Sequence, residues 1–340
     1  DITLFERAAR LGGHTATIKV ADHGVTRHID TGFIVYNDWT YPNFIRLMKE
    51  LNVATKPTEM SFSVSCERTG LEYGGNNLNT LFAQRKNLVN WSFLSMLKDI
   101  LRFNKEAVAD FKAGKLNADE TLGQYLERNH YSNVFRDFYL LPMGAAIWSS
   151  SLGGMLEFPL LFFVRFCNNH GLLSVNNRPT WRVITGGSHS YIPKIIQGFE
   201  NSIRLKCNIT EVTRKANRVE IIVNGVTEYF DEVVFACHSD EALSLLADAN
   251  DQERKILGAI EYRPNSVVLH TDERLLPKRK LAWSSWNYLL DDDTQKPPVL
   301  TYSMNILQSI KAPVEFCVTL NGRYKIDNSK ILGLYEYSHP

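Results

Sequence analysis

The sequence has none of the cysteine patterns that mark a disulfide framework or a zinc site. Its five cysteines are odd in number and scattered, with no C-x-x-C pair and no histidine at metal-ligand spacing. We therefore expect buried thiols in a protein of a reducing compartment, and no metal site.

Long apolar runs, an excess of one charge and internal repeats are missing too. The most apolar stretch, FPLLFFVRF, is interrupted by Arg165, well short of the roughly 18 residues that a membrane span needs. The 38 Lys and Arg balance 37 Asp and Glu, which gives no electrostatic reason to expect nucleic acid as a partner. We expect a cytoplasmic protein, either free or peripheral to the inner face of the membrane.

What the chain does contain is an interleaved series of strands and helices. Its 340 residues, 44% of them hydrophobic, suit two domains with sizeable cores. Alternating patterns predict two strands around the turn Asp22-His23-Gly24, a helix near Pro42, and a hairpin at Thr69-Gly70. The pattern predicts helices from 77 to 170. It predicts strands again from about 203 to 237 and over the last ninety residues. Two strand-rich blocks around a helical insertion are typical of a domain that is split in sequence.

The opening DITLFERAARLGGHT places an acidic residue, Glu6, at the end of a short strand and a glycine pair, Gly12-Gly13, six residues later. In a dinucleotide-binding unit, such a carboxylate ends the second strand and accepts the ribose hydroxyls, and G-x-G-x-x-G lies roughly 20 residues upstream. No such glycine motif occurs in this chain, so we expect it before Asp1, in a longer protein. The plain alternative is an exposed acid and an ordinary turn.

FERAARLGGHT resembles the E-x3-R-x-GG-[RH] segment of the FAD-dependent amine oxidase–like flavoproteins. Four further segments resemble the same superfamily in order: HIDTGFIVYNDWTYPNFIRLMKELNV, WRVITGGSHSYIPKI, IRLKCNITEVTRKANRVEIIV and DEVVFACHSDEALSLL. LPMGAAIWSS and VTLNGRYKID are similar to a bacterial subgroup described only as NAD/FAD-binding proteins or FAD-dependent oxidoreductases. The resemblance covers essentially the whole chain.

The resemblance implies an α/β fold. Its two domains together form an α+β arrangement. A Rossmann-like FAD-binding domain would comprise residues 1–55 and 183–248, with its first and last parts missing. It would be interleaved with a substrate domain, residues 56–182 and 249–340, which has a mixed sheet and the helical insertion 77–170. In this interpretation the strand VVFAC returns under the cofactor.

The resemblance also implies FAD as cofactor and assigns residues to it. Glu6 would bind the ribose, and Ile209 and Ala236 would pass near the adenine and the dinucleotide. Glycine at 12 and 13 would let the backbone approach the pyrophosphate closely. The remaining assignments are His14, where most relatives have Arg, and Gly32, Phe33 and Ile34 along the isoalloxazine. Simple core or turn roles are the alternative for each of them.

The sequence departs from the amine oxidases where their substrate is recognised. The lysine that they carry near flavin N5 aligns with Leu269, beside His270, and their aromatic cage and final flavin-binding segment have no counterpart here. The resemblance thus implies an FAD-dependent oxidoreductase that transfers hydride from a C–H bond, such as CH–CH of a fatty acyl chain, to flavin. The alternatives are a flavin amine oxidase and a non-catalytic or inactive fragment. The sequence selects no catalytic residue.

The helical insertion bears on the substrate. Between 155 and 166 it places a run of apolar residues, which would either line a tunnel for an acyl chain or fill a core. They are Met155, Leu156, Phe158, Leu160, Leu161, Phe162, Phe163 and Phe166. We expect a small hydrophobic substrate and transient contact with membrane lipid. Without the upstream glycine turn, residues 1–340 alone should hold FAD weakly, in an open groove near Glu6, Gly13, Gly32 and Ile209.

Overall fold

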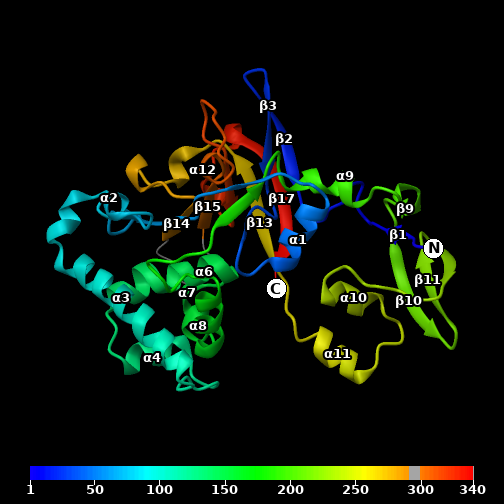
Figure 1. Ribbon diagram of the computed structural model, residues 1–340, viewed down its shortest axis with the longest axis horizontal. Helices are drawn as coiled ribbons and strands as arrows, with labels where there is room; N and C mark the ends of the chain where they lie inside the picture. Colours follow the sequence, from blue (N-terminus) through cyan, green and yellow to red (C-terminus); the bar gives the residue numbers. More distant parts are fainter. Residues whose placement is uncertain (291–298, 340) are drawn as a thin grey trace. The chain divides into compact units, whose positions relative to one another are not determined.

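The computed structural model describes residues 1–290 and 299–339, which form two compact units (Figure 1). The first unit comprises Asp1–His14, Tyr191–Pro264 and the last residues from Ser338. The second unit comprises Thr15–Ser190 and Asn265–Tyr337. No helix among the described residues is long and apolar enough to cross a membrane.

The second unit is built on a seven-stranded mixed sheet with the order β17-β13-β16-β15-β14-β6-β7. Strands β13 to β16 and the hairpin β6–β7 pair antiparallel, whereas β14 pairs parallel with β6. The bounds are β6 Phe62–Cys66, β7 Leu71–Gly74, β13 Arg263–His270, β14 Trp286–Leu290, β15 Val299–Ser303, β16 Cys317–Leu320 and β17 Ile331–His339. Phe62 and Trp286, 224 residues apart in sequence, are thus directly paired in one sheet, as the predicted interleaving requires.

Helices between 78 and 169 pack against this sheet, and they confirm the predicted helical insertion. They are α2 Leu78–Leu81, α3 Trp91–Lys112, α4 Leu122–Arg128, α5 Asn133–Phe135, α6 Leu141–Trp148, α7 Leu152–Leu156 and α8 Leu160–Asn169. The Asn90 side chain caps α3 by accepting from the N–H groups of Ser92 and Phe93, because the first N–H groups of a helix have no partner within it.

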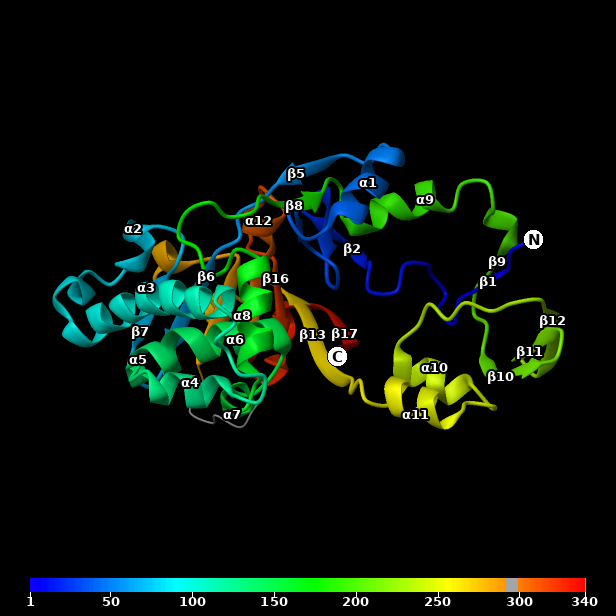
Figure 2. The same cartoon turned by 60° about the horizontal axis from the view of Figure 1, so that its bottom comes forward.

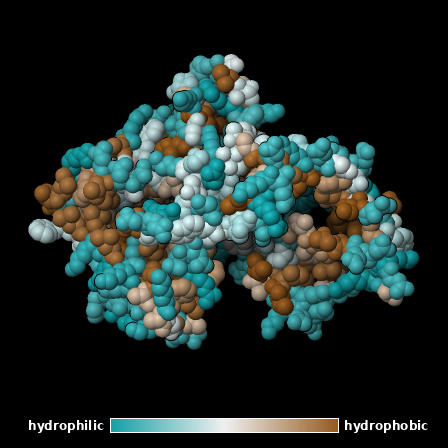
Figure 3. Space-filling view, in the orientation of Figure 1, coloured by the Kyte–Doolittle hydropathy of each residue, from teal (hydrophilic) through white to brown (hydrophobic). Residues whose placement is uncertain are grey.

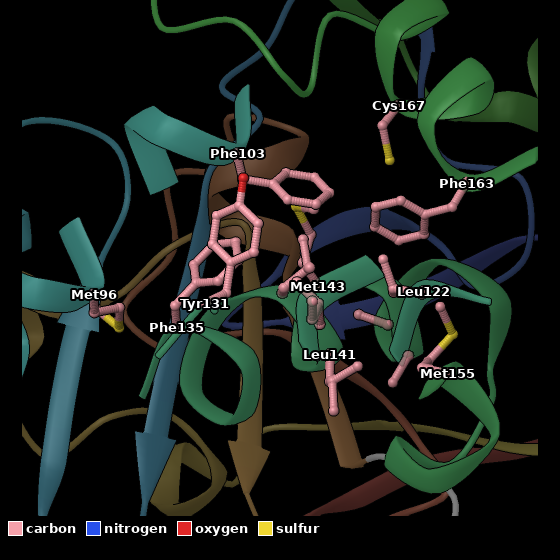
Figure 4. Packing of buried hydrophobic residues seen from close by; sticks show 14 of the residues in the cluster. Met96, Phe103, Leu122, Tyr131, Phe135, Leu141, Met143, Met155, Phe163 and Cys167 are labelled. Carbon is pink, nitrogen blue, oxygen red and sulfur yellow. The ribbon is translucent and has the colours of Figure 1, made fainter. Parts of the chain in front are cut away.

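The core of the second unit is an aromatic cluster between these helices (Figure 4). Phe103 is fully buried, and its ring lies 5.6 to 6.4 Å from those of Tyr131, Phe135, Tyr125 and Phe163. Met155, Leu160 and Phe163 are also fully buried in this cluster. These three residues of the 155–166 segment therefore fill a core, as one of the two predicted alternatives had it, and do not line a tunnel.

Smaller elements of the second unit confirm the local predictions. Strands β2 Thr17–Asp22 and β3 Val25–Asp30 meet at His23 and Gly24, whose φ angles of 46° and 79° form a tight hairpin turn. Helix α1 Pro42–Glu50 starts at its proline. The sheet β4-β8-β5 and a short helix complete the unit, with bounds β4 Tyr36–Asn37, β5 Thr55–Pro57, β8 Trp181–Ile184 and α12 Met304–Leu307.

The first unit holds a parallel strand pair and a separate antiparallel sheet (Figure 2). The pair is β1 Leu4–Phe5 with β9 Ile203–Arg204, and the sheet is β10 Ile209–Lys215, β11 Arg218–Val223 and β12 Val226–Phe230. Its helices are α9 Ile192–Ile195, α10 Ser239–Leu245 and α11 Asp251–Leu257. Arg214 of β10 joins sheet to helices through ion pairs of 3.0 Å with Asp248 and 2.6 Å with Glu253.

The predicted strand at 233–237 is wrong. Val233 and Phe235 pack on the small core under β10 and β11, but Val234 is 88% exposed and no strand is assigned there. The side chains therefore alternate between buried and exposed, as in a strand, but no backbone in the described chain pairs with this segment. Cys237 is exposed, against the expected burial, whereas the other four cysteines are buried as expected.

The compact units divide the chain elsewhere than the predicted domains do. Residues 15–55 and 183–190, predicted to belong with the FAD-binding segments, lie in the second unit. Hydrogen bonds between β3 and Ser188, described below, hold them there. The division into compact units does not show which residues contact the cofactor. The assignment of residues 15–55 and 183–190 to the FAD-binding domain therefore stays a prediction.

Candidate cofactor-binding site

Glu6 stands where a parallel strand pair ends. Its N–H donates to Arg204 O at 2.9 Å and its C=O accepts from Cys207 N–H at 2.9 Å, so two backbone hydrogen bonds hold Glu6 directly after the pair β1–β9. The Glu6 side chain is half-buried, and its Oε1 accepts from Ala8 N–H at 2.7 Å. Ligands of open α/β sheets bind outside the carboxyl ends of parallel strands, which is the position of this carboxylate.

Arg10 holds the loop that follows. Its guanidinium donates to Gly13 O at 2.8 Å and to Leu11 O at 3.3 Å. Because a trans peptide is planar, its N–H points away from the carbonyl of the same plane. The N–H groups of Gly12 and His14 therefore point to the side opposite the Arg10 guanidinium.

The two glycines are required by this loop. Gly12 has φ 108° and Gly13 has φ 51°, both in the region that L side chains rarely adopt. A Cβ placed on Gly13 would meet no atom within 4 Å, so the space beside it is open. Open space beside glycines at positive φ suits the close approach of a phosphate group to the backbone.

His14, Ile209 and Ala236, the other predicted residues of the first unit, differ in their surroundings. The His14 ring lies 5.4 Å from that of His238, which stacks on Tyr262 at 4.4 Å. Burial and the neighbouring His238 lower the pKa of His14, which keeps this imidazole neutral at pH 7. Ile209 pairs with Val223 just before a bulge in β10, whereas Ala236 is exposed and outside any strand.

In the second unit, Asp30 organises the glycine pair Gly186-Gly187. Asp30 is fully buried, and its carboxylate accepts from Thr17 Oγ1 at 2.5 Å, Ser188 N at 2.8 Å, Ser188 Oγ at 3.1 Å and Gln308 Nε2 at 3.0 Å. Burial raises the pKa of Asp30 to about 6 despite these donors. The carboxylate thereby fixes the turn after β8 against the end of β3.

Gly32, Phe33 and Ile34 follow directly on this anchored strand. Gly32 lies in a bend, and the half-buried Phe33 ring packs edge-on against Phe44 at 5.3 Å. The Ile34 side chain is 9% exposed and belongs to the core behind the sheet. Through Asp30 the bend is joined to Ser188 and Gln308, from distant parts of the chain, so its backbone is firmly positioned.

His270 lies beside Leu269, the residue that the resemblance aligns with the lysine of the amine oxidases. Leu269 is fully buried in β13. Asp272 N–H donates to His270 Nδ1 at 3.0 Å, and His270 Nε2 contacts Thr319 Oγ1 at 2.7 Å. Burial lowers the pKa of His270 to about 4, so a neutral ring with both nitrogens occupied stands beside an apolar residue.

The family model for flavin-containing amine oxidoreductases matches residues 1–306 of this chain. The chain belongs to this family. It is an FAD-dependent oxidoreductase with the mixed α/β fold of that family. No curated protein matches the sequence.

Solved structures of other flavoenzymes share the fold at low sequence identity. A putrescine oxidase triple mutant has a TM-score of 0.63 at 12% identity, with 98% of this chain and 78% of that chain covered. Cyclohexylamine oxidase from Brevibacterium oxydans IH-35A has 0.62 at 14%, covering 99% and 79%. A CLA-producing fatty acid isomerase from P. acnes also has 0.62 at 14%, covering 99% and 79%.

A carboxylate directly after a parallel strand pair and a glycine loop beside open space are chemically compatible with the family's FAD. That Glu6 binds the ribose and the loop the phosphates stays a prediction. Sequence reasoning missed the residues that position these groups. Arg10 belongs to the segment FERAARLGGHT and Asp30 to the segment HIDTGFIVY, but neither segment indicates what these side chains bond to. The bonds of Thr17, Ser188 and Gln308 to Asp30 follow no local sequence pattern.

Replacing Glu6 by Gln is expected to lower FAD affinity of the full-length flavoenzyme about ten- to a hundredfold. The amide keeps an oxygen for Ala8 N–H but loses a charge-assisted interaction with ribose hydroxyls worth roughly 1.5–3 kcal/mol. Fluorescence titration of apoprotein with FAD measures the change. Glu261→Gln, a side chain 82% exposed in the same unit, is the matched control; an equal affinity in both variants would remove Glu6 from the site.

Proposed function

We propose that this flavoenzyme oxidises a C–H bond of a small hydrophobic substrate at an apolar face of its seven-stranded sheet. The observation that carries the proposal is a row of directly paired residues across five strands: Phe62, Trp286, Tyr302, Val318 and Leu269. Directly paired residues project from the same face of a sheet. No member of the row carries a charge.

The row is open at one end and buried at the other. Val318 and Leu269 are fully buried, whereas Phe62, Trp286 and Tyr302 are half-buried. The Trp286 and Tyr302 rings meet edge-on at 5.3 Å. Burial raises the pKa of Tyr302 far above its usual range, so this hydroxyl stays neutral. An uncharged aromatic face of this kind favours apolar groups over a protonated amine without a counter-charge.

Trp286 adds a single polar feature. Its indole nitrogen is buried and has no hydrogen-bond partner within the described chain. A buried N–H without a partner costs roughly 1–3 kcal/mol, which an acceptor on a bound molecule would recover. The row therefore combines apolar area with one donor, as ligand sites commonly do.

A second set of residues is proposed to bind the FAD. Glu6, Gly12, Gly13, His14, Ile209 and Ala236 would contact the dinucleotide, and Gly32, Phe33 and Ile34 the flavin ring. When bound, the flavin supplies a two-electron acceptor for a hydride from the substrate. The protein then has to bind, orient and keep water out, for which the apolar row is suited, and no side chain is assigned as an acid or base.

Amine oxidation is the second candidate. It is favoured by the description of the family and by neighbours that are called putrescine oxidase and cyclohexylamine oxidase. A neighbour called a fatty acid isomerase shows that the fold is also used with acyl chains. The uncharged row and Leu269 in the lysine-aligned position favour the apolar substrate. A cytoplasmic location and contact with membrane lipid complete the proposal.

Binding of an uncharged fluorescent long-chain acyl probe, the methyl ester of cis-parinaric acid, tests the role of the row without turnover. Trp286→Ser should weaken probe binding about tenfold, because a large apolar contact is lost, while Trp286→Phe restores most of it. Trp39→Ser, at a position 44% exposed in the same unit, is the control. Equal probe affinity in wild type and Trp286→Ser, with unchanged melting temperatures, would reject the row as the substrate face.

A further inference from the structure

The stretch of the second unit from α2 to the first residue of α3 exposes several large apolar side chains. Leu78 is 76% exposed, Leu88 53%, Val89 80% and Trp91 85%. Figure 3 shows hydrophobic side chains gathered over the end of α2 and the start of α3, at the left of the view. Single exposed apolar residues need no explanation, but a contiguous group of them marks an interaction site.

The polarity of this segment is inverted, because its amide side chains are buried. Gln84 is 3% and Asn87 1% exposed. Gln84 Nε2 donates to Gly70 O at 2.6 Å, and Gln84 Oε1 accepts from Glu72 N–H at 3.2 Å and from Asn87 Nδ2 at 3.4 Å. These bonds attach the segment to the β6–β7 hairpin, so the outward position of Leu88 and Val89 is fixed by the fold.

Arg85 joins the two apolar parts into one surface. Its guanidinium donates to Asn79 Oδ1 at 2.6 Å and to Phe82 O at 2.8 Å. Helix α2, with Leu78, is thereby held against the 3₁₀ turn Arg85–Val89. Leu88 and Val89 are the last two residues of that turn, and Trp91 begins α3 two residues later.

The charges on this stretch have one sign. From residue 76 to 98 the sequence contains Arg85, Lys86 and Lys98 and no acidic residue. Lys86 and Lys98 are exposed. We name the set Leu78, Arg85, Lys86, Leu88, Val89, Trp91 and Lys98 the basic–apolar surface.

We propose that the basic–apolar surface docks on a lipid bilayer that contains anionic headgroups. Tryptophan is favoured at the boundary of headgroups and acyl chains, and lysine and arginine beside it are attracted to anionic lipid. A second copy of this chain fits less well, since a symmetric contact would bring the same cations against one another. The inference does not depend on which substrate the enzyme oxidises.

Co-sedimentation of the holoenzyme with phosphatidylcholine vesicles, with and without phosphatidylglycerol, tests this. Wild type should bind the anionic vesicles, and Val89→Ser/Trp91→Ser should lose about tenfold or more in partitioning. Lys86→Gln/Lys98→Gln should also weaken binding, but only to vesicles with phosphatidylglycerol. Val234→Ser, at a position 88% exposed in the first unit, is the matched control and should bind like wild type.

Three outcomes would overturn the proposal: no binding of wild type to either vesicle, equal binding by the Val89→Ser/Trp91→Ser variant, or a wild-type dimer that this variant converts to monomer. The last would assign the surface to a second copy. Thermal melting confirms that each variant is folded. Flavin reduction by a detergent-dispersed substrate should be unchanged in these variants, so failure of docking and failure of the proposed reaction are separately visible.

Discussion

Replacing Gly187 by Ala is expected to lower the free energy of unfolding of the second unit by about 2–5 kcal/mol. A Cβ on Gly187 would lie 2.4 Å from Thr17 Cγ2, 2.8 Å from Thr17 Oγ1 and 3.1 Å from Asp30 Oδ1. Thr17 cannot turn away without losing its bond to Asp30. Overpacking of this kind costs roughly 1–3 kcal/mol, and a side chain at positive φ costs roughly 1–2 kcal/mol more.

Gly186 offers a matched control one residue away. Its φ is 86°, close to the 97° of Gly187, but a Cβ there would meet no atom within 4 Å. Gly186→Ala should therefore lose only the conformational part, about 1–2 kcal/mol. Urea denaturation of both variants measures the difference, and equal losses would show that the contact with Thr17 and Asp30 is not tight.

Local patterns in the sequence predicted local structure well. The turn at His23-Gly24 needs only residues that accept positive φ between two alternating runs, and Pro42 fits the first turn of a helix. The strand predicted at 233–237 failed for a related reason. Alternation reports which side chains are buried, as Val233 and Phe235 are in part, but it cannot report whether another strand is available to pair.

The parts of the site that depend on long-range register were beyond the sequence. The row from Phe62 to Leu269 joins five strands whose order in the sheet differs from their order in the chain. Asp30 and Gln308 are 278 residues apart and yet bonded. Glu6 and its glycine pair could be proposed because one short motif carries them, whereas the basic–apolar surface became visible only once Gln84 and Asn87 were found buried.

The largest functional effect is expected in a comparison of two substrates that differ only in their headgroup. A long-chain fatty acyl compound and an alkylamine of the same chain length offer the same apolar area to the row of Phe62, Trp286 and Tyr302. Only the amine carries a cation, which the uncharged row and Leu269 would leave without a counter-charge. An unpaired charge in such surroundings costs several kcal/mol, so we expect the acyl compound to react at least about a hundredfold faster.

The measurement is anaerobic stopped-flow reduction of the FAD-loaded full-length enzyme, followed by loss of the absorbance of oxidised flavin. The account predicts rapid bleaching by the acyl compound, or by another uncharged hydrophobic substrate such as a carotenoid, and little bleaching by the chain-matched amine over the same time. Faster bleaching by the amine would contradict it and would assign the protein to the amine oxidases proper.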